Sequence, residues 1–148
     1  ADAFKKIADT KSTFVSRGDE SGTHKKELKV WGANSITPEG DWYMSAGKGM
    51  GDVLQIASEE GAYAITDKAT YLSMKDKLEL DIIVGESDDL MNQYTVIEVN
   101  PDKLEGINKE GADAYLEWIT SDEVLAKINE FGKEEYGDAL FTVNYEAK

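Results

Sequence analysis

The sequence contains no cysteine, and among its 148 residues it has only two prolines, one histidine and one arginine. The absence of cysteine excludes disulfide scaffolds, thiolate zinc sites and cysteine nucleophiles. The lone histidine, His24, has no second histidine for a metal site and no marked serine partner, so we expect it to pack at the start of a helix. We therefore expect a protein that is not an enzyme and that holds no metal or cofactor.

Long apolar runs and an excess of basic charge are also missing. No stretch approaches the roughly 20 apolar residues that a membrane-spanning helix needs, and the N-terminus lacks the apolar core of a signal peptide. The chain has 30 acidic and 16 basic residues, a net charge of −14. Such an acidic body is repelled by nucleic acids and anionic membranes, so neither is expected as a partner. The 41% of apolar residues is enough for one compact domain with a core.

The apolar residues alternate between strand-like and helix-like spacing along the chain. Strands are expected at residues 13–16, 42–44, 62–66, 78–84 and 94–99. Helices are expected at about 21–32, 52–60, 67–72, 112–119 and 120–131, the last with a capping box of Thr120 and Glu123. Strands separated by helices indicate an α/β domain with a mixed, mostly parallel sheet flanked by helices.

Polar groups gather where the first expected strand meets the first long helix. A helix start leaves backbone N–H groups unpaired and carries a partial positive charge, which together suit an oxyanion. Ser21 and Thr23 add hydroxyl donors, and Gly22 lets a ligand approach the backbone closely. Arg17 offers a planar fork of donors for an oxyanion, and Asp19 either holds Arg17 or accepts a proton from a protonated anion. These five residues are the candidate anion-binding site.

Two points remain open. At the junction of strand and helix, the alternative to an anion site is that Ser21 or Thr23 only caps the helix and that Arg17 is a surface charge. We favour the anion site because Arg17 lies at the carboxyl end of a strand, where α/β sheets bind ligands. The glycine-rich segment 47–51 matches neither a dinucleotide fingerprint nor a P-loop. We expect it to be the entry to a helix, while a second helix N-terminus near Lys48 at the same site is the alternative.

Five runs of sequence resemble one known family. They are 14–27 (FVSRGDESGTHKKE), 49–51 (GMG), 62–72 (AYAITDKATYL), 92–97 (NQYTVI) and 137–141 (GDALF). In this order they resemble the tungstate-binding proteins of bacterial ABC importers, which are type II periplasmic binding proteins. The shorter pattern Arg-x-Asp-x-Ser-Gly-Thr is also similar to phosphate-binding proteins, in which these positions hold the oxyanion. The resemblance implies ligand contacts from Arg17, Asp19, Ser21, Gly22 and Thr23.

The sequence departs from that family in two ways. Lys68 stands where the family usually has arginine, and no Thr/Ser-rich binding loop is found near Ala1. Since the family folds as two lobes that close on the anion, we expect residues 1–148 to form a single α/β domain that corresponds to the second lobe. This domain includes a return crossover at about 91–99 and the C-terminal helices, and the N-terminal lobe with half of the site is absent from the chain.

The resemblance implies a non-enzymatic, monomeric protein outside the cytoplasm, periplasmic or lipid-anchored, with its signal segment outside this chain. It implies binding of a tetrahedral oxyanion, tungstate or molybdate, and delivery of that anion to the permease of an ABC importer. A phosphate-binding transport protein is the alternative within this class. An anion-sensing domain or an enzyme domain for a phosphorylated ligand is the alternative outside it. Sulfate is less favoured if Asp19 faces the ligand, because sulfate has no proton to share.

Overall fold

The structure is a computed structural model that describes residues 2–85 and 87–145. The chain divides into two compact units, residues 1–91 and residues 92–148. No helix within the described residues is both long and apolar enough to cross a membrane.

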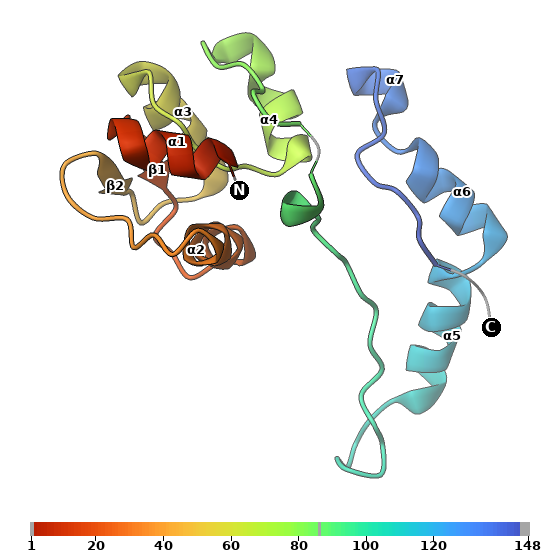
Figure 1. The fold of residues 1–148 in the computed structure, drawn as a ribbon. Helices are drawn as coiled ribbons and strands as arrows, with labels where there is room; N and C mark the ends of the chain where they lie inside the picture. Colours follow the sequence, from red (N-terminus) through yellow and green to blue (C-terminus); the bar gives the residue numbers. More distant parts are fainter. Residues whose placement is uncertain (1, 86, 146–148) are drawn as a thin grey trace. The chain divides into compact units, whose positions relative to one another are not determined.

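The first unit is a small parallel sheet with helices packed on both faces (Figure 1). In chain order it contains α1 (Asp2–Thr10), β1 (Phe14–Ser16), α2 (Gly22–Ala33), β2 (Tyr43–Ser45), α3 (Met50–Glu60), α4 (Lys68–Met74) and the 3-10 helices η1 (Lys75–Lys77) and η2 (Asp88–Leu90). The two strands pair in parallel, with Phe14 opposite Tyr43 and Ser16 opposite Ser45. This arrangement confirms the expected α/β class with a parallel sheet flanked by helices.

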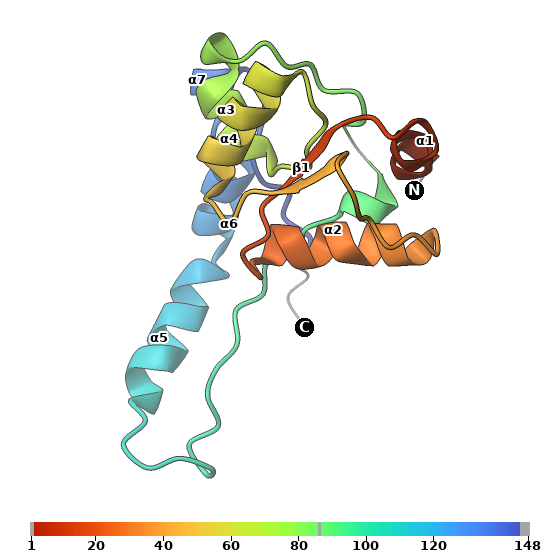
Figure 2. The same cartoon turned by 90° about the vertical axis from the view of Figure 1, so that its left-hand side faces the viewer.

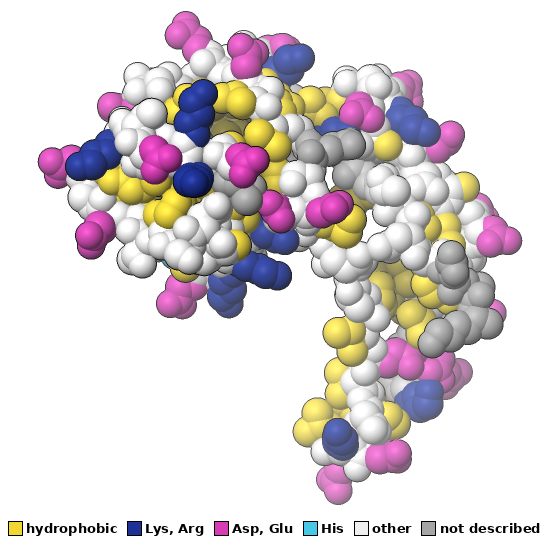
Figure 3. Space-filling view, viewed as in Figure 1, with side chains coloured by type: hydrophobic (Ala, Val, Ile, Leu, Met, Phe, Trp, Pro, Cys, Tyr) yellow, Lys and Arg dark blue, Asp and Glu magenta, His cyan; other side chains and the backbone are white. Residues whose placement is uncertain are grey.

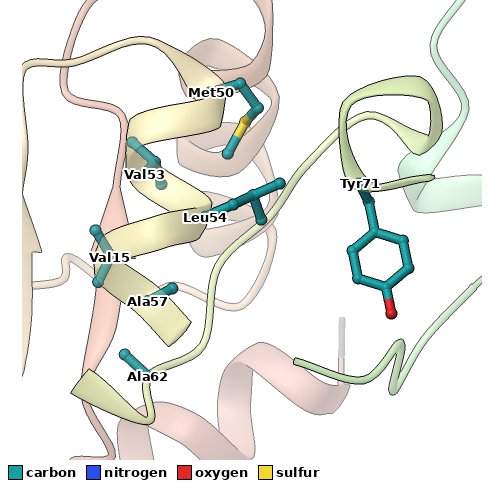
Figure 4. Packing of buried hydrophobic residues seen from close by; sticks show 7 residues of the cluster. All are labelled: Val15, Met50, Val53, Leu54, Ala57, Ala62 and Tyr71. Atoms are coloured by element: carbon teal, nitrogen blue, oxygen red, sulfur yellow. The ribbon is translucent and has the colours of Figure 1, made fainter. Parts of the chain in front are cut away.

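Alternate side chains of β1 point to opposite faces of the sheet, and each face has its own core. Val15 packs against Val53, Leu54 and Ala57 of α3, in a cluster that also contains Tyr71 of α4 (Figure 4). Phe14 faces the other way, toward α1 and α2. That second cluster consists of Phe4, Ile7, Phe14, Val30 and Trp31.

The first four expected helices and strands are confirmed in type, although their bounds shift by a residue or two. The segment expected as a strand at 62–66 is instead a single parallel bridge between Tyr63 and Phe14. The backbone N–H of Val15 donates to the Tyr63 carbonyl at 2.8 Å, and the N–H of Tyr63 donates to the Thr13 carbonyl at 2.9 Å. The chain therefore pairs with β1 at this one bridge and does not continue as a strand.

The prediction of a strand at 78–84 is wrong. No strand pairing is present within these described residues. Leu78 and Leu80 are half-buried against the cluster around Val15, and the Tyr71 hydroxyl donates to the Leu80 carbonyl at 2.9 Å. Ile82, Ile83 and Val84 are exposed. The alternating pattern therefore reflects the packing of Leu78 and Leu80 against the cluster around Val15, and it does not indicate a strand of the sheet.

The second unit contains three helices, α5 (Lys109–Ile119), α6 (Asp122–Glu130) and α7 (Lys133–Tyr136), within the residues that the structure describes. The strand expected at 94–99 is also wrong, since this segment is irregular. It is held beside residues 141–144 by side chains: the Asn144 amide donates to Gln93 at 2.7 Å, and the Tyr94 ring lies edge-on to Phe141.

The capping box expected at Thr120 and Glu123 is wrong as well. Ser121 is the N-cap of α6, without a side-chain capping bond. The Thr120 hydroxyl donates backward to the Leu116 carbonyl at 2.7 Å, and Glu123 accepts a bond from Lys127 at 2.6 Å. Both side chains therefore bond to groups one helical turn away, and neither takes part in a capping box.

Large apolar side chains lie on the surface of the second unit (Figure 3). They include Tyr94, Ile97, Val99, Leu104, Tyr115, Trp118 and Phe131. Among its described residues only Val124 is a buried apolar residue, so this unit has little core of its own.

Candidate functional site

The residues expected to bind an anion lie in the β1–α2 turn (residues 17–23), at the carboxyl end of β1 (Figure 2). Because β2 runs parallel to β1, the loop that follows β2 is at the same edge of the sheet. Two backbone bonds join the loops: the N–H of Ala46 donates to the Ser16 carbonyl at 2.9 Å, and that of Lys48 to the Arg17 carbonyl at 3.2 Å. The turn is thus fixed on one side by the neighbouring strand.

Arg17 and Asp19 form an ion pair within this turn. The Nε and Nη2 atoms of Arg17 both donate to Oδ2 of Asp19, at 3.0 and 2.5 Å. The other oxygen, Oδ1, accepts the backbone N–H of Ser21 at 3.1 Å. The Ser21 side chain and its backbone N–H, followed by the Arg17 guanidinium, lower the pKa of Asp19 to about 2. Asp19 is therefore ionised at neutral pH and holds Arg17 in place.

The start of α2 leaves several donors unused. Ser21 is the N-cap, and its hydroxyl oxygen accepts the backbone N–H of His24 at 3.3 Å. The backbone N–H groups of Gly22 and Thr23, the Thr23 hydroxyl and Nη1 of Arg17 have no hydrogen-bond partner among the residues that the structure describes. Unpaired N–H groups at the positive end of a helix dipole attract anions. The five expected site residues thus supply one fixed guanidinium and a set of open donors within seven positions.

His24 closes the turn. Its Nδ1 accepts the backbone N–H of Glu20 at 3.0 Å, which supports the positive φ of 60° at Glu20. No group of three or more His, Cys, Asp or Glu side chains suited to a metal ion occurs among the described residues.

Gly18 lies between the two members of the ion pair and has no room for a side chain. Its φ of +59° is in the left-handed region, and a Cβ atom at this position would lie 1.9 Å from the Ser45 hydroxyl oxygen. Glycine is therefore needed here for both backbone conformation and close approach to β2. The glycine-rich segment 47–51 is the helix entry that its sequence predicted: Gly49 is the N-cap of α3.

A buried polar cluster that the sequence did not predict adjoins the turn. The Glu27 side chain is fully buried, with an exposed fraction of 0%. It accepts bonds from the hydroxyl of Ser16 at 2.7 Å, the phenol of Tyr43 at 2.7 Å and the indole Nε1 of Trp31 at 3.2 Å. Burial, followed by the Glu27 carboxylate, raises the pKa of Tyr43 to about 12. The one available signal was the spacing of Glu27 and Trp31, four residues apart on one helix.

Comparisons with known proteins show which family the chain resembles. The model of the PBP superfamily domain matches residues 1–123. The tungstate-binding protein TupA of Peptoclostridium acidaminophilum is 61% identical over 142 residues, which cover 96% of this chain and 50% of that protein. The chain therefore spans about half the length of this curated relative.

Solved structures give the same result. The tungstate-binding protein TupA from Desulfovibrio alaskensis G20 has a TM-score of 0.82 at 38% identity, over 99% of this chain and 60% of that one. The tungstate ABC transporter structure from Geobacter sulfurreducens has a TM-score of 0.74 at 39% identity, over 87% of this chain and 55% of that one. The resemblance to tungstate-binding proteins is confirmed by these matches, and the chain belongs to the PBP superfamily.

Proposed function

We propose that the protein containing this chain binds a tetrahedral dianion, tungstate or molybdate, at the β1–α2 turn. The observation that supports this most is the ion pair of Arg17 and Asp19 beside the open N–H groups of Gly22 and Thr23. A guanidinium held by a carboxylate keeps its remaining N–H donors in place, so that less side-chain freedom is lost when an anion binds. The names of the relatives, which are tungstate-binding proteins, favour tungstate among the tetrahedral anions.

The state of Asp19 favours an anion without a proton. Both oxygens of Asp19 are engaged by Arg17 and the Ser21 N–H, and its pKa is lowered to about 2. With these bonds made, Asp19 is less able to accept a proton from phosphate. The expectation that Asp19 disfavours sulfate stays a prediction, and the larger size of the oxometalates is a second basis for separating them from sulfate.

The protein's partners follow from the same proposal. The chain would form the second lobe of a two-lobe binding protein together with its return crossover, as a single domain over residues 1–148. The other lobe would complete the anion site, and the closed protein would deliver the ion to a membrane permease of an ABC importer. We place this protein outside the cytoplasm, periplasmic or lipid-anchored, as a monomer without enzymatic activity.

The test is titration calorimetry on the complete gene product that contains this chain, with tungstate, molybdate, phosphate and sulfate. We expect tungstate and molybdate to bind most tightly. Arg17→Ala removes one charge-assisted contact of about 1.5–3 kcal/mol, so Kd should rise roughly 10- to 150-fold. Lys29→Ala, which removes an equal charge from an exposed position of α2, is the matched control and should leave Kd within about twofold. An unchanged Kd in Arg17→Ala places the site elsewhere, and preference for phosphate excludes an oxometalate.

A further inference from the structure

The buried Glu27 carboxylate has three neutral donors and no cationic partner among the residues that the structure describes. A buried carboxylate is costly unless its oxygens accept hydrogen bonds. Ser16, Trp31 and Tyr43 provide these bonds, one to Oε2 and two to Oε1. An apolar side chain of similar size would avoid this cost, so the position of the carboxylate calls for a role beyond filling the core.

One of the three bonds leads directly to the β1–α2 turn. The hydroxyl of Ser16, itself 0% exposed, donates to Glu27. Because its single proton is used in that bond, the lone pairs of Ser16 face the turn, and Oγ accepts the backbone N–H of Gly18 at 3.2 Å. Gly18 is the residue between Arg17 and Asp19. Glu27, Ser16 and Gly18 thus form a directed chain of hydrogen bonds from the interior of α2 to the backbone of the ion pair.

We propose that Glu27 is a positioning residue for the anion site: through Ser16 it fixes the Gly18 amide and thereby the backbone that presents Arg17 and Asp19. This inference rests on the proposed function of the β1–α2 turn. A glutamine at position 27 is a poorer partner than the carboxylate. With its oxygen toward the Tyr43 phenol and the donor-only Trp31 indole, its NH₂ group faces the Ser16 hydroxyl, which must then turn and accept. The Ser16 proton would point away from position 27 and disturb the bond that Oγ accepts from the Gly18 N–H.

Tyr43 gives an internal comparison for this role. Its phenol donates to the same carboxylate at 2.7 Å, and its ring stacks on Phe14. Among the described residues, Tyr43 makes no hydrogen bond to residues 17–23. Loss of the Tyr43 hydroxyl therefore removes a bond to Glu27 of the same length without breaking the chain through Ser16.

The experiment uses the complete gene product and two measurements on each variant: the tungstate Kd from calorimetry and the hydrogen-exchange rate of the Gly18 amide from NMR. We expect Glu27→Gln and Ser16→Ala each to raise both quantities about tenfold. The double variant should be no worse than either single one, because both break the same chain. Tyr43→Phe should lower the unfolding midpoint but leave Kd and Gly18 exchange within about twofold.

The outcomes separate this inference from the proposed function. If the parent protein binds no tungstate, the proposed function fails, and the Gly18 exchange rate alone decides whether Glu27 holds the turn. If tungstate binds but Glu27→Gln and Ser16→Ala change neither quantity, the positioning role is overturned. It is equally overturned if Tyr43→Phe weakens binding as much as Glu27→Gln does. If Glu27→Gln does not fold, the comparison of Ser16→Ala with Tyr43→Phe tests the positioning role by the same two measurements.

Discussion

Arg17 donates two hydrogen bonds to one oxygen of Asp19, while the other Asp19 oxygen accepts the N–H of Ser21, the residue that caps α2. The only arginine of the chain is therefore tied to the helix start through a single carboxylate. If the proposed function is correct, this pairing is how a chain with a net charge of −14 offers an anion a favourable site. Short-range donors and the helix dipole act at the turn, whereas the distant carboxylates are screened by salt.

Asp19→Asn should destabilise the protein in a pH-dependent way. The folded pKa of about 2 lies below the ordinary value of 3.8, so the carboxylate contributes stability above about pH 4 and loses it as the pH falls through 2. Asparagine does not titrate. We expect the difference in urea midpoint between parent and Asp19→Asn to be constant from about pH 5 to 7 and to shrink below about pH 4. A difference that grows on acidification would show that Asp19 is not held as an anion.

The structure of the β1–α2 turn was predictable because its signals are local. A strand, one arginine and a Ser-Gly-Thr helix start occur within ten consecutive residues, and the cap at Ser21 formed as its residue type predicts. The cluster around Glu27 was not predictable in the same way. It joins Ser16 and Tyr43, which are 27 positions apart in sequence and meet only through the pairing of β1 with β2.

The helix face of α2 illustrates the same limit. The spacing of His24, Leu28 and Trp31 places them on one face of this helix, but Leu28 is 45% exposed while Glu27 is completely buried. Hydrophobic spacing favours the leucine, and the tertiary bonds to Glu27 rotate the helix against that preference. The expected strands at 78–84 and 94–99 failed for a related reason, since alternation indicates which side chains can be buried and not whether a partner strand is present.

Gly18→Ala should destabilise the first unit by about 1–2 kcal/mol, because alanine disfavours the left-handed backbone and its Cβ would displace the Ser45 hydroxyl. Gly40→Ala is the matched control. Gly40 also has a positive φ, of 87°, but nothing lies within 4 Å of its added Cβ. Urea unfolding measures the loss of unfolding free energy in each variant. The amount by which the loss in Gly18→Ala exceeds that in Gly40→Ala is the cost of the contact with Ser45. Equal losses would mean that the hydroxyl rotates away without cost.

Leu54→Ala tests the core that supports the sheet from the α3 side. Leu54 is 2% exposed and packs in the cluster with Val15 and Val53, so its truncation should cost about 2–5 kcal/mol. Leu28→Ala makes the same chemical change at a position of α2 that is 45% exposed, and it should change the unfolding free energy by less than about 0.5 kcal/mol. Comparable losses in the two variants would contradict the assigned face of α2.

Residues 1–148 by themselves should bind tungstate only weakly, with a Kd near 1 mM or about −4 kcal/mol. The β1–α2 turn offers its donors beside open water, where each charge-assisted bond competes with hydration. In the complete gene product a second lobe would exclude that water and strengthen every donor, so the same anion should bind far more tightly there. Calorimetry on both forms, each with Arg17→Ala as the control for specific binding, measures the difference. Micromolar binding by residues 1–148 that Arg17→Ala abolishes would show that this turn forms a complete site without a second lobe.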